Sequence, residues 1–333
     1  MSSPNQNKSV SGKILILGLC IIAFCLLYTG AWFWAAGKTK TWVTDDLANG
    51  SFNGINVQCA NSDVRGYPFR IGIFCDTITT EGVQPGTQAS FGAFRSAAQV
   101  YAPGHAVFEL DGPAVVRPER GILASLDWDL LHGSVVAGLD GIDRTSIETN
   151  NAKIDLQSDL ADESLGITLQ HGELHMRRNN DDLDIAASTR GTSLSSTLPY
   201  STLPPFGLSS DLTLTGYAPF LAGQRPLSGQ AVSGEIRHLA LDFGEQGSLQ
   251  LSGPFTKEAD GILSGEFDVK ATNFKMLGTV LKEAFPDATQ AINLTEQLLR
   301  GLTGDGETAS VHLSVRRGSV FLGFIPLGVI PPL

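Results

Sequence analysis

The residues best suited to chemistry lie in one pentapeptide, His171-Gly172-Glu173-Leu174-His175. On a helix the two imidazoles, four residues apart, would share one face and could chelate a zinc ion. Gly172 and the alternation in Ile167–Leu169 favour a strand instead, where four residues at about 3.3 Å each would separate the two rings by roughly 13 Å. Because that distance is too long for one ion, we expect histidines on the surface of a strand and no metal site.

Sequence motifs of the common enzyme classes are absent. The chain has no Gly-x-Ser-x-Gly elbow, no phosphate-binding loop and no Gly-x-Gly-x-x-Gly fingerprint. Acidic clusters such as Asp181-Asp182-Leu183-Asp184 lack the spacing of a calcium loop. We therefore predict no catalytic residue and no cofactor, although a site assembled from distant residues would leave no such motif.

The second chemical feature is a pair of cysteines, Cys59 and Cys75, which are the first and last residues of the segment CANSDVRGYPFRIGIFC. Alternation from Phe69 to Cys75 predicts a strand, and the motif Gly66, Tyr67, Pro68, Phe69 and Arg70 contains a predicted turn. A hairpin centred on that turn would place Cys59 opposite Cys75, at the Cα separation that a disulfide needs. Two unrelated buried thiols are the alternative. We predict the bridge, and a stable disulfide indicates an oxidising compartment outside the cytoplasm.

An apolar run, Ile14–Ala36, must position everything that follows. It contains no charge and no proline, and its 23 residues are enough to cross a bilayer core of about 30 Å. A cleaved signal peptide would have a shorter apolar core and small residues at its exit, where this chain has Trp34. We predict a cytoplasmic tail at 1–13, one transmembrane helix at 14–36 and a stalk at 37–58.

The remaining chain, 59–333, is predicted to be one extracytoplasmic β-rich domain. Short alternating runs are separated by glycine, Asp-Gly and proline, which is typical of antiparallel strands. The proline-rich segment 197–206 is the one possible internal boundary. The net charge of the whole chain, −11, argues against binding nucleic acid by charge alone.

Two amphipathic helices are predicted between Asn273 and Gly301. Asn273 can cap the first, Pro286 stops it, and Gly301 ends the second. Their apolar stripe could line a groove for an acyl chain or could fill a core, and the pattern leaves both possibilities open. The residues concerned are Phe274, Leu277, Leu281, Leu294 and Leu298.

The block from Cys59 to Cys75, placed behind an N-terminal anchor, resembles a bacterial domain-of-unknown-function family, number 2125. The stretches 98–105 and Leu183-Asp184-Ile185-Ala186 are also similar to that family. The segment from Asp260-Gly261 to Leu281 loosely resembles the long β-sheet envelope proteins of the AsmA kind, a likeness of fold alone.

The family resemblance implies a membrane-anchored envelope protein and brings no activity. We expect a location in the bacterial inner membrane, with the bulk of the chain in the periplasm. Two functions stay open, a binding module for lipid or another apolar ligand and a structural scaffold that contacts an envelope protein.

Overall fold

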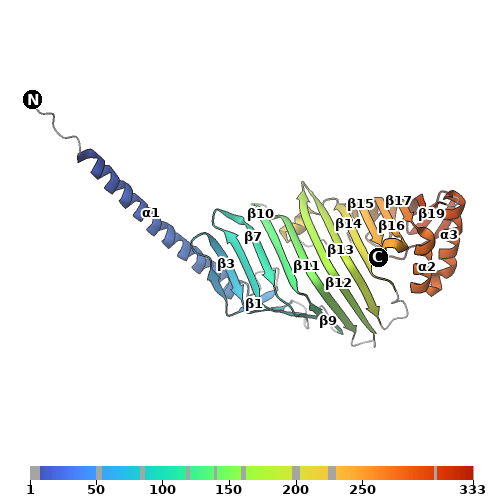
Figure 1. Ribbon diagram of the computed structural model, residues 1–333, viewed down its shortest axis with the longest axis horizontal. Helices are drawn as coiled ribbons and strands as arrows, with labels where there is room; N and C mark the ends of the chain where they lie inside the picture. The colour runs from blue at the N-terminus through green and yellow to red at the C-terminus, as the bar shows by residue number, and fades with distance from the viewer. Residues whose placement is uncertain are drawn as a thin grey trace, which may run out of the picture.

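The protein is an elongated antiparallel sheet with a long helix at one end and a helix pair at the other (Figure 1). The computed structural model describes residues 8–49, 55–82, 87–117, 121–138, 141–158, 163–196, 203–223, 230–303 and 306–332. Its accessible surface is 20600 Å², whereas a compact protein of 35.3 kDa would expose about 13,000 Å². The excess fits an extended shape in which α1 projects from an elongated sheet (Figure 1). The mainly β fold with its C-terminal helix pair is confirmed.

The N-terminal helix α1 (Lys8–Thr41) contains the whole apolar run and continues into a π-helical turn, Trp42–Asp46. Among the described residues it is the one helix that is long and apolar enough to cross a membrane, by length and composition. Most of its apolar stretch is exposed, which suits a helix that lies in lipid, whereas Trp32 and Ala36 are buried. The helix reaches five residues beyond Ala36, so the predicted stalk begins as a continuation of the span.

The first four strands form one long hairpin that bends in the middle. The strands are β1 (Asn56–Ala60), β2 (Asp63–Arg65), β3 (Arg70–Cys75) and β4 (Thr77–Glu81). One register runs through both halves, with β1 paired to β4 and β2 paired to β3. At the bend, the side-chain amide of Asn61 donates to the carboxylate of Asp76 over 2.8 Å, and Asn61 has a φ of 52°. Left-handed backbone suits asparagine and lets the chain pass from one part of the sheet to another.

The strands β1 to β10 form two separate parts of the sheet, which we call wings. Both wings extend from the strand β11 (Gly141–Ser158). The first half of β11 pairs with β10 and its second half pairs with β9. One wing continues through β7, β6 and β3 to β2, and the other through β8, β5 and β4 to β1. The strands not yet introduced are β5 (Gln88–Phe91), β6 (Phe94–Gln99), β7 (Ala102–Leu110), β8 (Ala114–Arg117), β9 (Ile122–Asp127) and β10 (Leu130–Gly138).

The predicted disulfide is present, and it joins the two wings at the end away from β11. Cys59 of β1 and Cys75 of β3 have Cα atoms 5.2 Å apart. The predicted register was wrong, because Cys59 lies opposite Ile78 and the observed pairing sets Val64 opposite Ile73. The two cysteines are not directly opposite each other in a flat hairpin. The bend at Asn61 brings them together.

Beyond β11 the chain is a meander in which each strand pairs with the next one in sequence. The strands are β12 (Glu163–Asn179), β13 (Asp182–Ser196), β14 (Phe206–Leu214), β15 (Val232–Asp242), β16 (Ser248–Lys257), β17 (Leu263–Thr272), β18 (Thr308–Arg316), β19 (Ser319–Leu322) and β20 (Ile325–Val329). The predicted internal boundary lies partly outside the described residues, which omit 197–202. The strands on its two sides, β13 and β14, are direct neighbours.

The helix pair α2 (Phe274–Ala284) and α3 (Thr289–Thr303) lies between β17 and β18 in sequence. Asn273 occupies the N-cap position of α2 in a left-handed conformation, but its side chain makes no capping hydrogen bond. Its side-chain amide donates to the carbonyl of Glu245 over 2.7 Å. The second helix runs two residues past Gly301. Phe274 and Leu299 pack on Ala271 and Ala309, so the pair covers one face of the last strands.

Candidate functional site

A largely apolar row of side chains crosses one face of the sheet from β7 to β18. Directly opposed residues of neighbouring antiparallel strands point to the same face, so the register traces a row of side chains across the sheet. We call the face that carries this row the apolar face. Its members, from β7 to β18, are Phe108, Gly133, Ile147, Leu174, Ala187, Ser210, Leu239, Leu251, Val269 and Val311.

The row ends in an apolar pocket under α3, to which Val269 and Val311 contribute. The cavity has a volume of about 120 Å³, and Thr295 is the one polar residue of its lining. The other lining residues are Leu249, Ala271, Leu298, Leu299, Ala309, Leu313, Leu322 and Leu327. Apolar cavities of this order stay dry and accept small apolar groups. The pocket can therefore hold a hydrocarbon segment and offers nothing to bind a charged one.

The structure places the five predicted groove residues in three different surroundings. Phe274 and Leu277 are buried in two separate core clusters, and Leu281 packs against the second of them. Leu298 lines the pocket under α3. Leu294, one turn earlier on the same helix, is 54% exposed.

Sequence reasoning missed the pocket residues that come from the sheet. Leu249, Leu322 and Leu327 belong to β16, β19 and β20. The available signal was the apolar half of the alternation in the Leu249–Gly253 run, which marks a strand face but does not say which helix faces it.

The opposite face, which we call the polar face, carries the histidines. His171 and His175 both lie on β12, and each ring contacts the Glu173 carboxylate between them, at 2.8 Å and 3.4 Å. These two hydrogen bonds lower the pKa of Glu173. Within the described part of the chain, no group of three or more His, Cys, Asp or Glu residues is arranged to hold a metal ion.

A hollow of about 700 Å³ lies on the polar face over β3, β6, β7 and β10 to β12. Its lining includes the apolar Val107 and Leu130 and the charged Arg95, Glu109 and Glu148. Arg95 is held by two hydrogen bonds from its terminal nitrogens to the Asp111 carboxylate. This surface is mixed in character, unlike the pocket under α3.

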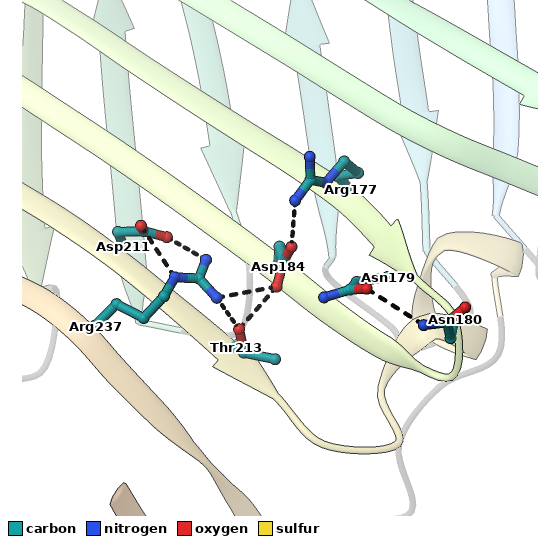
Figure 2. Close-up of polar contacts among 7 residues, drawn as sticks. All are labelled: Arg177, Asn179, Asn180, Asp184, Asp211, Thr213 and Arg237. Carbon is teal, nitrogen blue, oxygen red and sulfur yellow. Dashed lines mark hydrogen bonds and ion pairs between the residues drawn. The ribbon is translucent and has the colours of Figure 1, made fainter. Parts of the chain in front are cut away.

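The most strongly perturbed acid, Asp184, lies further along the polar face (Figure 2). Burial opposes its ionisation, but hydrogen bonds donated by Arg177, Thr213 and Arg237 outweigh burial and lower its pKa to about 2. Arg177 and Thr213 both donate over 2.7 Å. Arg237 also donates to both oxygens of Asp211, which raises the pKa of the guanidinium. The cluster links β12 to β15 and is fully paired, so we assign it to holding these strands in register.

The chain matches one family model over residues 32–331, described as an uncharacterized protein conserved in bacteria (DUF2125). No curated protein and no solved structure matches the chain.

Proposed function

Because the chain belongs to this DUF2125 family of uncharacterised bacterial proteins, which supplies no activity, we propose from its own surfaces that it is a membrane-anchored binding module for an acyl chain or a similar apolar ligand. The observation that carries the proposal is the pocket under α3. It is almost wholly apolar and is continuous with the row of the apolar face through Val269 and Val311.

The apolar row supports a path for the ligand from the anchored end of the sheet. The row starts at Phe108 in β7, and β7 belongs to the wing that α1 contacts through β2. Its last members line the pocket under α3, and α3 lies at the end of the sheet opposite α1 (Figure 1). An acyl chain lying on such a row would be removed from water at roughly 0.8 kcal/mol per buried CH₂.

We propose further that the sheet lies in the bacterial periplasm, with α1 in the inner membrane. The Cys59–Cys75 disulfide supports an oxidising compartment, and a single apolar helix supports anchoring. A scaffold that contacts another envelope protein is the alternative function, and it would leave the pocket under α3 as an ordinary packing gap.

Photo-crosslinking separates the two functions. The full chain, in lipid nanodiscs, is irradiated with a fatty acid that carries a diazirine on its acyl chain, and the labelled peptides are identified by mass spectrometry. We expect labels in α3 and β16, where Leu298 and Leu249 line the pocket. Labels confined to α1 would rule out the binding module.

Two substitutions on one helix provide the matched control. Leu298→Trp fills the pocket and is expected to abolish the label in α3 and β16. Leu294→Trp adds the same ring at the exposed position one turn away and is expected to leave that label unchanged. Equal labelling of the two variants would show that the pocket is not the site.

A further inference from the structure

The sheet domain touches α1 inside the apolar run, through the turn Gly66–Arg70. The hydroxyl of Tyr28 donates to the carbonyl of Pro68 over 2.5 Å, and the indole of Trp32 donates to the carbonyl of Arg70 over 2.9 Å. The hydroxyls of Thr29 and Tyr67 lie 2.7 Å apart. The turn is therefore fixed beside the middle and last third of the apolar run.

The depth of these contacts follows from the length of a helix. A bilayer core of about 30 Å takes about 20 helical residues at 1.5 Å each. Counted from Ile14, the first apolar residue after Lys13, those residues reach Phe33. Tyr28, Thr29 and Trp32 fall in the last third of that segment, so a turn bonded to them lies close to the boundary between the hydrocarbon core and the interfacial layer.

Most backbone carbonyls of the turn have a hydrogen-bond donor within the protein. Arg70 N–H donates to the carbonyl of Gly66 over 2.8 Å, and Val100 N–H donates to the carbonyl of Phe69 over 3.0 Å. Together with the bonds from α1, four of the five carbonyls from Gly66 to Arg70 have a donor. Pairing backbone polar groups within the protein lowers the cost of placing irregular backbone next to a bilayer, where water is scarce.

Aromatic side chains project from this turn and from the one next to it. Phe69 is 67% exposed, and Tyr101 is 76% exposed. Tyr101 lies in the β6–β7 turn, which is joined to Phe69 by the hydrogen bond from Val100 N–H. The ring of Tyr67 packs edge-on against Trp32 and stacks on Phe33 of α1. Exposed aromatic rings beside a membrane span are typical of the lipid–water boundary.

Exposed basic residues lie beside the apolar run and the turn. Lys38 and Lys40 follow the apolar run on α1 and are exposed, as is the side chain of Arg70 at the end of the turn. Cations on long side chains can reach phosphate groups while their stems cover apolar surface.

From these contacts we infer that the tip of the sheet domain, Tyr67, Phe69 and Tyr101, inserts into the interfacial layer of the bilayer that α1 spans. The partner is the lipid itself. The inference needs α1 to cross a membrane and does not depend on the pocket under α3. The protein thus has two membrane contacts, and the second one holds the sheet in a fixed position against the bilayer.

Spin labels measure the depth of the tip. In a Cys20→Ala, Cys25→Ala background that keeps the Cys59–Cys75 disulfide, nitroxide labels are placed at Phe69→Cys and at Tyr101→Cys. The full chain is reconstituted in phosphatidylethanolamine–phosphatidylglycerol nanodiscs. Relaxation of each label by oxygen, which enriches in lipid, is compared with relaxation by a polar nickel chelate, which is excluded from it.

Two further labels calibrate the result. Phe24→Cys lies in the apolar run, and Phe324→Cys lies in the fully exposed β19–β20 turn at the other end of the sheet. We expect the labels at positions 69 and 101 to show oxygen and nickel accessibilities between those at positions 24 and 324. If both match position 324 while position 24 is lipid-exposed, the tip stands in water and the inference is wrong. If position 24 is also in water, the anchor itself is wrong.

Discussion

The indole N–H of Trp32, in the apolar run of α1, donates to the backbone carbonyl of Arg70, 38 residues further along the chain, over 2.9 Å. Trp32 is 5% exposed although it belongs to a helix whose neighbouring residues face outward. The helix and the sheet are thus joined by a partly buried hydrogen bond in addition to the covalent chain.

Replacing that indole tests the contact. Trp32→Phe keeps a ring beside Tyr67 but leaves the Arg70 carbonyl without its donor, which we expect to destabilise the chain by about 1–3 kcal/mol. The measurement is thermal unfolding of the full chain in nanodiscs. Trp34→Phe is the control, because Trp34 is 69% exposed and its loss should change little. Equal shifts for the two variants would contradict the role given to Trp32.

The disulfide should contribute stability through the loop that it closes. Cys59 and Cys75 are 16 residues apart, and a loop of that size corresponds to about 3 kcal/mol on the chain-entropy model. Cys59→Ser should lower the melting temperature and release one thiol. The unreduced wild type, when denatured, should react with two equivalents of thiol reagent, from Cys20 and Cys25. A reaction with four equivalents would show that the bridge is absent.

Asp184 should make the sheet sensitive to acid. Its pKa falls from an ordinary value of 3.8 to about 2 in the folded chain, so its contribution to stability is complete above about pH 4 and disappears as the pH falls towards 2. A difference of this size corresponds to about 2 kcal/mol. Urea unfolding at pH 4.5 and pH 2.5 should show a larger loss in the wild type than in Asp184→Asn.

The control for that comparison is Asp155→Asn. The Asp155–Lys153 pair is exposed on both sides, and such pairs contribute little. If Asp155→Asn removes as much of the acid sensitivity as Asp184→Asn does, the assignment to Asp184 fails.

A polar substitution on α2 should reveal a packed core. Leu281 packs against the cluster of Phe243, Leu277 and Val280, so Leu281→Gln buries an amide without a partner and should destabilise the chain by about 2 kcal/mol. Leu294→Gln, at the exposed position on α3, should stay within about 0.5 kcal/mol of the wild type. Urea midpoints of the two variants give the comparison, and equal midpoints would place Leu281 on an accessible surface.

The direction of the anchor can be read with fusions at the C-terminus. Alkaline phosphatase needs export and disulfide formation, so it should be active there if the sheet lies outside the cytoplasm. A green fluorescent reporter that matures in the cytoplasm should stay dark. The opposite pattern would reverse the proposed topology.

Local features of this fold could be predicted from the sequence. The alternation in β3, the Asp260-Gly261 turn between β16 and β17 and the apolar spacing of α2 and α3 each depend on neighbouring residues. The disulfide could also be predicted, although by an incorrect register. The cysteines meet because Asn61 and Asp76 form a bend, and nothing in a flat hairpin pattern indicates that bend.

The non-local pairings and the pocket could not be predicted. β3 pairs with β6, and β9 pairs with β11 rather than with β10, the next strand in sequence. Alternation of side chains alone does not determine which strands become neighbours. The pocket under α3 combines Leu249, Leu298 and Leu327, whose meeting depends on that tertiary arrangement. The helix pattern therefore indicated an apolar stripe without showing which of its residues would line a cavity.

The shared strand β11 has a consequence for the order in which the chain can fold. Domains emerge N-terminal end first during synthesis, and both wings need β11, which is complete only at Ser158. Until β11 is made, the strands β9 and β10 that pair with it have unpaired edges. Unpaired strand edges promote aggregation of nascent chains. Every strand after β11 finds its partner already in place. We therefore expect chaperone dependence to be concentrated in the first half of the chain, with the second half growing onto it one hairpin at a time.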